Sequence, residues 1–540
     1  MKNIVAFVVF FYCLNLHAQT VGTLSNQAAS INGYTLFSPN PDTNTYLIDN
    51  CGHLMNRWSS RYFPALSAYL LEDGSLLRTC RLNNQTFTQG GSGGRIERYD
   101  WDGNLIWEFN FSNAQYCQHH DIEYLANGHI LILATELKTQ AECIAAGRDP
   151  NLLQDGEIWS EFVVEIAPVG TDSGTIVWEW HSWDHLVQDY DMTKNNYQAQ
   201  TNIPNKFNLN YVGNNSKADW MHANSIDYNA GLDQIVLCSK KWSELWVIDH
   251  STTTAEAQAD TGGNAGMGGD ILYRWGNPVC YGQFGQKLLF DPHDIHWIDS
   301  GLVDAGKLMI FNNGKNRGWS SVDIIQPPID NNGQYNLTGS QYGPSTTDWS
   351  YSDPTPSNFF AVRISGAQRI ENGNTLVCSG PNGYFFEVDS NNNKVWEYIN
   401  PVTINGISTQ GQGLAGGNSV FRAYRYSPNY AGFAGRTLTQ VLPIELNPTT
   451  SNCSLYTSLP AFQTKESNFS VYPNPFDHQI QIEQQTSENT LDVVIYNIMG
   501  QIVYKTKLSD SISTLQLAML PKGSYILHLG NYPATIILKN

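Results

Sequence analysis

The segment "HDIEYLANGHILIL" (120–133) is the clearest copy of a pattern that runs through the larger part of this chain. It has a polar start, an apolar strand, a turn containing Gly and a second apolar strand, which is the pattern of an antiparallel hairpin. The same phrase recurs four more times, with loops of different length between the copies. These copies are "YLLEDGSLLRTC" (69–80), "NSIDYNAGLDQIVLCS" (224–239), "HDIHWIDSGLVDAGKLMIF" (293–311) and "GAQRIENGNTLVCSG" (366–380).

A second phrase, a turn followed by a strand that ends in Trp, accompanies the first. It ends at Trp107, Trp178 and Trp396, and weaker copies end at Trp58 and Trp275. We interpret these indoles as packing between repeated units rather than as ligand contacts. Radial repetition of small antiparallel sheets is the way in which a β-propeller protects its strand edges. The repeats therefore predict an all-β fold whose main body, residues 19–460, is a β-propeller.

The composition agrees with this interpretation and excludes one class of partner. Only 15% of the 540 residues are charged and 45 are Gly, which suits short strands and tight turns better than long surface helices. The formal net charge of -19 argues against nucleic acid, because phosphate binding needs a basic face.

The first residues predict export. Lys2 precedes an apolar run from Ile4 to Leu16, and Leu16-His17-Ala18 resembles a small-residue cleavage site, so residues 1–18 are predicted to be a signal peptide. The alternative is an N-terminal anchor helix, for which the run is short. No later segment reaches about 18 consecutive apolar residues, so we expect no transmembrane span.

Eight cysteines remain after the predicted signal peptide. An even number in an oxidising compartment permits disulfides, although the pairing cannot be deduced from sequence. Cys238 and Cys378 stand inside apolar strand-like runs and are equally well explained as buried thiols.

The composition changes near residue 465. Alternating strands with Gly turns follow, in "FSVYPNPFDHQIQIEQ", "LDVVIYNIMGQIVYKTKL" and "STLQLAMLPKGSYILHL". A stretch of about 70 residues with this pattern is typical of a small β-sandwich. Residues 467–540 are therefore predicted to form a separate C-terminal domain.

Three histidines occupy the same place in the repeat, just before an apolar strand. They are His120, His222 and His293. The first strand of each propeller blade lines the central channel, so the three imidazoles are expected to gather at one mouth of that channel. They could bind a metal, act as nucleophile and general acid or base, or fill a polar channel with hydrogen bonds. Asp121 and Asp294 follow two of them, but adjacent residues on a strand point to opposite faces, which argues against a metal set.

Cations near such a cluster would favour the chemistry of anions. The candidates are Lys240 and Lys241 after one repeat strand and Arg363 and Arg369 in "RISGAQR". The alternative is that each is a solvated charge at the end of a strand.

Several ordered motifs in about residues 50–430 resemble the bacterial arylsulfotransferases, which use no nucleotide sulfate donor. These motifs are "HHDIEYLANGHILIL", "DWMHANSIDYN", "YRWGNP", "FDPHDIHW" with "LMIFNNG", and "RISGAQRIENGNTLVCSGPNGYFFEV". The resemblance implies a six-bladed propeller and sulfuryl transfer from a phenolic sulfate donor to a phenol acceptor. The implied route is ping-pong through a sulfohistidine, with no metal and no other cofactor.

The resemblance also implies roles for single residues. His293 matches the nucleophilic histidine of the family, and His120 matches its first active-site histidine. His222 and Asn224 match the family's H-x-N pair. These residues would orient the sulfate and handle the phenolic proton.

The remaining expected substrate-binding residues are His119, Lys240 and Arg363. The family has an arginine where this chain has Lys240, which supplies charge but not the bidentate fork. Arg363 is expected to compensate if its strand faces the same mouth.

The C-terminal stretch resembles the sorting domain of cargo of the type IX secretion system. "VYPNPF", "VVIYNIMGQIVY" and "LPKGSYILHL" carry this resemblance. It implies a Gram-negative bacterium, transit through the periplasm, contact with the secretion machinery, and a destination outside the cell or on its surface. The alternative is a carbohydrate-binding β-sandwich.

The sequence thus favours an enzyme that transfers sulfuryl groups between phenols. Two alternatives stay open, an aryl sulfate hydrolase in which water accepts the group and a secreted propeller that only binds or adheres.

Overall fold

A computed structural model describes residues 19–213, 216–330, 333–414, 416–449, 453–455, 469–484, 491–497, 502–508, 510, 512–529 and 535–540. The chain divides into two compact units, Met1–Leu455 and Tyr456–Asn540. The predicted signal peptide and the predicted domain boundary between residues 460 and 467 lie outside the described residues. Within the described part of the chain, no helix has the length and apolar character needed to cross a bilayer.

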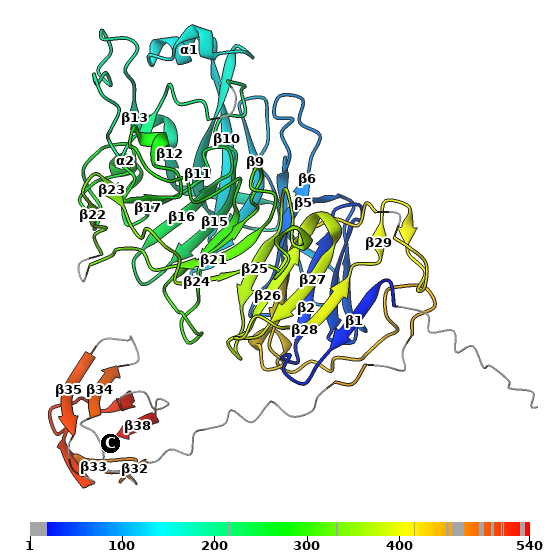
Figure 1. Ribbon diagram of the computed structural model, residues 1–540, viewed down its shortest axis with the longest axis vertical. Helices are drawn as coiled ribbons and strands as arrows, with labels where there is room; N and C mark the ends of the chain where they lie inside the picture. The colour runs from blue at the N-terminus through cyan, green and yellow to red at the C-terminus, as the bar shows by residue number, and fades with distance from the viewer. Residues whose placement is uncertain are drawn as a thin grey trace, which may run out of the picture. The chain divides into compact units, whose positions relative to one another are not determined.

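Six antiparallel sheets of four or five strands make up most of the larger unit, among the residues that the structure describes (Figure 1). The first sheet contains β31 (Val420–Tyr426), β2 (Tyr34–Pro39), β3 (Asn44–Asp49) and β4 (Leu54–Ser59). The second contains β5 (Pro64–Leu70), β6 (Leu76–Arg81), β7 (Gly94–Tyr99) and β8 (Leu105–Asn110). The third contains β9 (Tyr116–Tyr124), β10 (Ile130–Thr139), β11 (Glu157–Val169) and β12 (Ser173–His181).

The other three sheets follow in chain order. The fourth contains β15 (Ala223–Asn229), β16 (Gln234–Ser239), β17 (Glu244–Asp249) and β18 (Tyr273–Trp275). The fifth contains β19 (His293–Trp297), β20 (Leu308–Asn312), β21 (Ser321–Ile325) and β24 (Trp349–Tyr351). The sixth contains β25 (Gly366–Arg369), β26 (Thr375–Ser379), β27 (Tyr384–Val388), β28 (Lys394–Ile399) and β1 (Gly22–Asn26). The prediction of an all-β fold is therefore confirmed.

The connections hold short elements only. Three two-stranded ribbons pair β13 (Leu186–Val187) with β14 (Phe207–Asn208), β22 (Leu337–Thr338) with β23 (Gln341–Tyr342), and β29 (Val402–Thr403) with β30 (Gly406–Ile407). The α-helices are α1 (Gln140–Ala145) and α2 (Thr254–Ala257). Single 3-10 turns are η1 (Pro150–Leu152), η2 (Ser182–His185), η3 (Pro278–Tyr281), η4 (Pro356–Asn358), η5 (Gly380–Asn382) and η6 (Ala431–Phe433).

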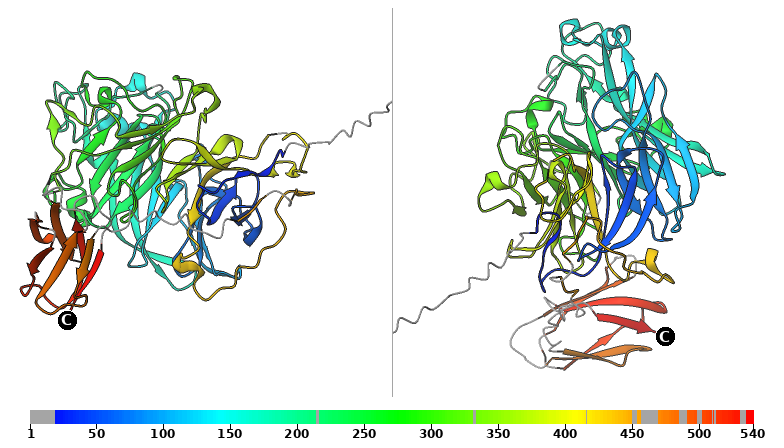
Figure 2. Two further views of the ribbon diagram at one scale, coloured as in Figure 1. Left: turned by 60° about the horizontal axis from the view of Figure 1, so that its bottom comes forward. Right: turned by 90° about the vertical axis from the view of Figure 1, so that its right-hand side faces the viewer.

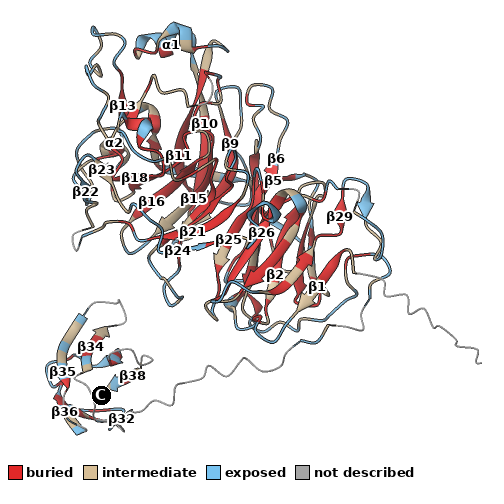
Figure 3. Ribbon diagram, viewed as in Figure 1, coloured by how far each residue is buried: buried red, intermediate tan, exposed pale blue. Residues whose placement is uncertain are grey.

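Buried apolar clusters fill the spaces between neighbouring sheets, in a cycle that returns to its start. The strands of these sheets are largely buried, as the red colour in Figure 3 shows. The cluster between the third and fourth sheets, for example, contains Leu133 and Val163 on one side and Ile235 and Leu237 on the other. The innermost strands contact one another in the order β5, β9, β15, β19, β25, β31 and back to β5. Residues at the same point of these six strands are therefore brought toward a common axis.

The repeated Trp residues join neighbouring sheets at five of the six junctions between the described sheets. The indole N–H of each donates a hydrogen bond from a fourth strand to a turn or strand end of the following sheet. These bonds are Trp58 to Asp100 O (2.8 Å), Trp107 to Ser173 O (3.0 Å), Trp178 to Thr252 Oγ1 (3.2 Å), Trp275 to Pro344 O (2.7 Å) and Trp396 to Asn50 O (2.8 Å). All five side chains are buried. An indole has one donor, and its burial is stable only when that donor is paired.

The two ends of the larger unit close the cycle. β31, from near residue 420, pairs with β2 in the first sheet, and β1 pairs with β28 in the sixth (Figure 1). Cys51 and Cys453 form a disulfide across 402 positions of sequence. The six other described cysteines are buried thiols, including Cys238 and Cys378.

The smaller unit contains two antiparallel sheets, drawn in orange and red in Figure 2. One contains β32 (Phe469–Tyr472), β33 (Gln479–Gln484) and β36 (Ile512–Gln516). The other contains β35 (Ile502–Leu508), β34 (Leu491–Asn497), β37 (Gly523–Leu529) and β38 (Thr535–Lys539). Side chains of both, such as Ile480 and Leu527, share one apolar core, so this unit has a core of its own.

Reduction of the Cys51–Cys453 disulfide is expected to lower the free energy of unfolding of the larger unit by about 2–5 kcal/mol, because the bond closes a long loop of the unfolded chain. Scanning calorimetry with and without dithiothreitol measures the effect. Cys453→Ser should unfold at the midpoint of the reduced wild type and should not respond to the reductant. A wild-type midpoint that is the same in both conditions would contradict this expectation.

Candidate active site

The three repeat histidines stand at irregular points of their strands. Each strand has a shift in its pairing register close to the histidine. The shift is at residues 119–121 in β9, at residue 224 in β15 and at residues 294–295 in β19. A β-bulge of this kind redirects the side chains beside it. His120, His222 and Asp294 have φ values of 52°, 54° and 54°, a left-handed conformation that is uncommon outside glycine.

The structure brings these histidines together in a buried cluster. The ring centres of His120 and His222 lie 4.9 Å apart. The side chains of His120, His222 and His293 are all inside the protein, with 3%, 6% and 2% of each residue exposed. Burial and then the charge of His222 hold the pKa of His120 well below its ordinary value, and His293 contributes to the same effect. The predicted convergence of residues from β9, β15 and β19 is therefore present.

The neighbours of His293 determine which ring nitrogen carries the proton. Its Nδ1 lies 2.7 Å from Asn313 Oδ1 and 3.2 Å from the carbonyl oxygen of Asp291. Asn313 Nδ2 donates to the carbonyl oxygens of Ala361 and Ile364, which fixes the amide with its oxygen toward the imidazole. Since both neighbours of Nδ1 are acceptors, Nδ1 carries the proton and Nε2 has the free electron pair.

Nε2 of His293 accepts the N–H of Ile364 at 3.2 Å. Ile364 has a φ of 47° and the next residue, Ser365, has a φ of 89°. A left-handed conformation is strained for a β-branched residue, and such strain is found most often at functional sites. Here the unusual backbone turns a peptide N–H toward the imidazole.

His120 has a different kind of support. Glu161 Oε1 accepts the N–H of Ala223, and Glu161 Oε2 lies 2.8 Å from Nε2 of His119. The carboxylate accepts a hydrogen bond from the Nε2–H of His119, so His119 Nδ1 accepts from His120 Nδ1 at 2.9 Å. His120 is thereby left with an unprotonated Nε2. His119 precedes His120 in the sequence and is not one of the three cluster histidines. It acts on the cluster through its hydrogen bond with His120.

Gly91 closes the space beside His120. The N–H of His120 donates to Gly91 O at 2.8 Å, and a Cβ at position 91 would lie 2.2 Å from the ring atom Nε2. Gly91 also has a φ of 84°. Only glycine satisfies both conditions.

His222 is held by a carboxylate. Its Nδ1 lies 2.8 Å from Asp219 Oδ2, and Lys241 Nζ lies 2.9 Å from the same oxygen. Burial by itself would raise the pKa of Asp219, but His222 and Lys241 lower it, so the carboxylate stays charged. His222 therefore presents Nε2 as the nitrogen that is free to exchange a proton.

Lys240 lies at the same cluster, and Arg363 does not. The N–H of Lys240 donates to His222 O at 3.1 Å, and the charge of Lys240 is, after burial, the largest influence that lowers the pKa of His293. Burial lowers the pKa of Lys240 itself. Arg363 is exposed, and its side chain makes no hydrogen bond or ion pair with the cluster in the described part of the chain.

Asn224 is wholly buried next to the cluster. Its Nδ2 donates to the carbonyl oxygen of Pro292, the residue before His293, at 2.8 Å. Its Oδ1 is buried and has no hydrogen-bond partner among the described residues. The amide thus links β15 to the start of β19.

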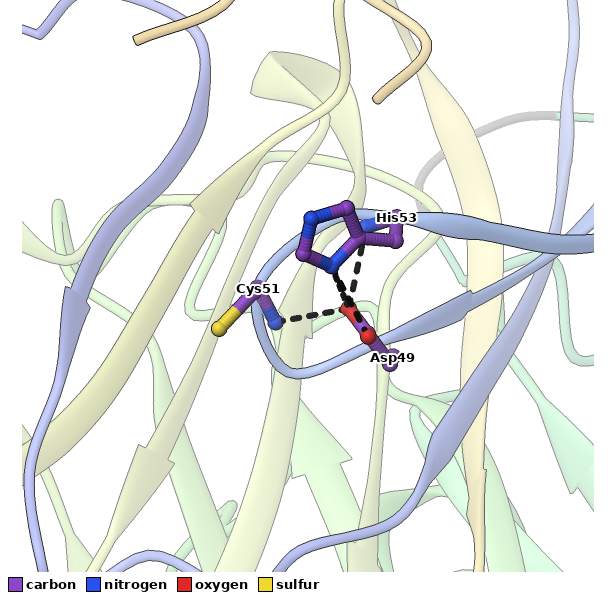
Figure 4. A group of neighbouring side chains, drawn as sticks. All are labelled: Asp49, Cys51 and His53. Carbon is purple, nitrogen blue, oxygen red and sulfur yellow. Dashed lines mark hydrogen bonds and ion pairs between the residues drawn. The ribbon is translucent and has the colours of Figure 1, made fainter. Parts of the chain in front are cut away.

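A metal-like grouping of side chains lies in another place. Asp49, Cys51 and His53 have ligand atoms within 4.8 Å of one another (Figure 4). Cys51 is bound in the disulfide with Cys453, and Asp49 accepts hydrogen bonds from the backbone N–H groups of Cys51 and His53. The grouping is therefore explained as a backbone turn whose N–H groups are bound by the Asp49 carboxylate.

A cavity of about 910 Å³ is lined in part by later residues of the innermost strands. Its wall includes Glu123, Asp227 and His296, and none of the three cluster histidines. Burial raises the pKa of Glu123 well above its ordinary value, and nearby carboxylates add to the effect. The histidine cluster is thus separate from this acidic cavity.

Sequence patterns found the histidines but missed the residues that orient them. Asp219 precedes His222 by three positions inside a quoted motif, and Asn313 is in "LMIFNNG", so both were available as signals. Glu161 stands in an apolar run of β11 and carried no signal.

Comparison with solved structures gives distant likenesses. A protein of unknown function from Bacteroides caccae is 10% identical, with a TM-score of 0.39, and the match covers 73% of this chain and 99% of that one. Virginiamycin B lyase from Staphylococcus aureus is 13% identical, with a TM-score of 0.33 and coverage of 72% and 87%. The Cps50 (Swd1) β-propeller domain of Myceliophteria thermophila is 10% identical, with a TM-score of 0.34 and coverage of 69% and 88%.

No curated protein matches this sequence. Two family models do match it. The model of the secretion system C-terminal sorting domain matches residues 470–539. The arylsulfotransferase model matches residues 23–412, which is more than half of the chain and includes every residue of the histidine cluster. The chain therefore belongs to the arylsulfotransferase family and carries a type IX secretion sorting domain at its C-terminal end.

Proposed function

We propose that this protein transfers a sulfuryl group from a phenolic sulfate ester to a phenol through a sulfohistidine at His293. The observation that carries the proposal is the fixed tautomer of His293, in which Asn313 holds the proton on Nδ1 and leaves the electron pair on Nε2. A neutral imidazole with a fixed orientation is a competent nucleophile near pH 7. Burial and Lys240 keep the pKa of His293 well below its ordinary value, so the ring stays neutral.

In the first half-reaction the Nε2 electron pair forms a bond to sulfur. The bond between sulfur and the aryl oxygen breaks, and the phenolate leaves with its electron pair. Nε2 of His222, whose Nδ1 is held by Asp219, gives the leaving oxygen its proton. His293 is then an N-sulfoimidazolium that keeps its Nδ1 proton.

In the second half-reaction the oxygen of the acceptor phenol attacks sulfur. The bond between sulfur and Nε2 breaks, its electrons return to the imidazole of His293, and His222 takes the phenolic proton. Both rings return to their starting states, so the cycle balances. Water in place of the phenol would give hydrolysis.

Three groups support the charge of the transferred sulfuryl group. The N–H of Ile364 lies 3.2 Å from Nε2 of His293 and is placed to donate to a sulfuryl oxygen once sulfur approaches. Lys240 supplies a nearby positive charge in place of the arginine of the family. The second amide proton of Asn224 completes the proposed set. His120, which burial keeps neutral, would orient the phenol as an acceptor through its unprotonated Nε2. Arg363 stays a prediction, since no contact supports it.

We also propose the larger organisation. Residues 19–460 would form a six-bladed β-propeller, with one blade for each sheet, and residues 467–540 a β-sandwich that directs the chain to the type IX machinery. Residues 1–18 would be removed during passage to the periplasm. The cycle of buried clusters between sheets and the sorting-domain match support this organisation.

The central experiment is an assay of the purified protein with 4-nitrophenyl sulfate. His293→Ala is expected to lower kcat to background, since the nucleophile is lost, while circular dichroism and the unfolding midpoint change little. His296→Ala is the matched control, because His296 is on the same strand and lines the separate cavity. A phenol acceptor should accelerate release of 4-nitrophenol by the wild type, and an unchanged rate with acceptor would favour hydrolysis. Turnover by His293→Ala would overturn the assigned nucleophile.

Lys240→Ala is expected to raise KM for the aryl sulfate about 10-fold or more, because a charge-assisted contact of about 1.5–3 kcal/mol is removed. Lys240→Arg should retain most of the affinity, since the family places an arginine here. Initial rates at varied 4-nitrophenyl sulfate measure both. Lys307→Ala, whose ammonium pairs with Asp304 and Asp348, is the control for a lost surface charge. An unchanged KM in Lys240→Ala would exclude the lysine from substrate binding.

The stability of the protein is expected to fall as the pH drops below about 6.5. His120 and His293 have lower pKa values in the folded protein than in the unfolded chain, so the unfolded chain binds more protons in this range. Urea unfolding at several pH values between 7 and 5 gives the slope. His120→Gln should show a shallower slope than the wild type, and an equal or steeper slope would contradict the assignment.

A further inference from the structure

Arg422 is a buried cation on β31, the strand that closes the first sheet. Its side chain is 4% exposed. It makes ion pairs with two carboxylates, through Nη1 to Asp121 Oδ2 at 2.7 Å and through Nε to Asp294 Oδ1 at 2.8 Å. Nη2 also donates to the carbonyl oxygen of Asn224 at 3.1 Å.

These three contacts reach the three strands that carry the cluster. Asp121 follows His120 on β9, and Asp294 follows His293 on β19. Asn224 is two residues after His222 on β15. Each contact is therefore made within two residues of an imidazole and at the point where the pairing register of that strand shifts.

The contacts of Arg422 lie beside the acidic cavity. Arg422 and Asp294 line this cavity, whereas none of the three histidines does. No hydrogen bond joins Arg422 to His120, His222 or His293 in the described part of the chain.

We propose that Arg422 is the positioning residue of the histidine cluster, which fixes β9, β15 and β19 relative to one another through contacts next to each imidazole. The proposal rests on the proposed function, because positioning matters for catalysis only if the histidines react. Arg422 touches neither the substrate nor the reacting atoms, and it acts through Asp121, Asp294 and the backbone of Asn224.

The planar guanidinium of arginine suits this task. Nη1 and Nη2 donate hydrogen bonds to residues of β9 and β15, and the charge forms an ion pair with Asp294 on β19. The carboxylates have further partners. Asp121 accepts the hydroxyl of Tyr69 at 2.6 Å, and Asp294 Oδ2 accepts the N–H of Ala367 at 2.8 Å. A lysine would keep the charge, but its compact ammonium lacks the extended fork that reaches residues of three strands.

The same strand provides a matched control, Arg425. It is also buried, and it pairs with the buried carboxylate of Glu387 at 3.4 Å. Its other donors reach Thr35 Oγ1 and Asn50 Oδ1, both at 2.8 Å and both in the first sheet or the turn that follows β3. It makes no contact with β9, β15 or β19 among the described residues.

The test compares Arg422→Lys with Arg425→Lys by three measurements. The unfolding midpoint shows how far each substitution weakens the fold. Kinetics with 4-nitrophenyl sulfate separate kcat from KM. Ring resonances of isotope-labelled histidine, assigned by His120→Gln, His222→Gln and His293→Gln, report the geometry of the cluster whether or not the protein turns over.

We expect both variants to lose a similar amount of thermal stability. Arg422→Lys should lower kcat by about 10- to 100-fold, because small displacements of reacting groups cost this much, with KM changed less than about 3-fold. The ring resonances of all three cluster histidines should move in Arg422→Lys and stay in place in Arg425→Lys. If Arg422→Lys does not fold, Asp121→Asn serves as the second variant, with the same expected pattern of resonances and kcat.

Two results would overturn the proposal. One is that Arg422→Lys folds and the ring resonances of the three cluster histidines do not move. The other is an equal loss of kcat in Arg422→Lys and Arg425→Lys, which would mean a purely structural role. If the wild type does not turn over any aryl sulfate while the resonances move as expected, Arg422 still positions the cluster, and the proposed function is what fails.

Discussion

The pairing of β31 with β2 is the contact on which the rest of the larger unit depends. It pairs Tyr34–Pro39 with Val420–Tyr426, so nearly all of the larger unit lies between these two strands in the sequence. The entropy lost by closing a loop grows only slowly with its length. Closing this long loop therefore adds little to the free-energy cost of folding once the intervening sheets have formed. β31 also carries Arg422. The strand that closes the cycle of sheets is therefore the strand whose arginine contacts the three strands next to the histidines.

Burying the Arg422 cluster is costly. Moving a guanidinium and two carboxylates out of water carries a penalty of several kcal/mol for each ion, and their mutual attraction returns this only when the geometry is good and the remaining donors and acceptors are satisfied. Asp121 and Asp294 meet that condition through hydroxyl and peptide donors. Burial opposes the charge of Arg422, yet the two carboxylates hold its pKa well above its ordinary value. A buried ion cluster of this kind is better explained by the arrangement that it imposes than by stability.

The repeat pattern in the sequence was sufficient to predict some features and not others, for a physical reason. His120, His222 and His293 recur at one point of a repeating unit, and Trp58, Trp107 and Trp396 at another, so periodicity located them. Glu161 and Arg422 belong to strands other than those of the histidines they support, Asn313 directly follows β20, and none of the three recurs with the repeat. Residues that come together only in the closed fold do not recur at a fixed spacing, so a search for repeats in the sequence does not find them. Arg422, in "VFRAYRY", likewise lies outside the repeated phrases and therefore carried no such signal.

The partners of the two central imidazoles fit the different roles proposed for them. Asp219 carries a negative charge and can balance an imidazolium, which suits a ring that exchanges a proton with a phenol. Asn313 is neutral and accepts the Nδ1 proton without taking it, so sulfurylation of Nε2 would leave a full positive charge on the ring of His293. That charge weakens the new nitrogen–sulfur bond and makes the imidazole a good leaving group. A carboxylate in the place of Asn313 would hold the ring charge more strongly, so the neutral amide fits the proposed two-step transfer.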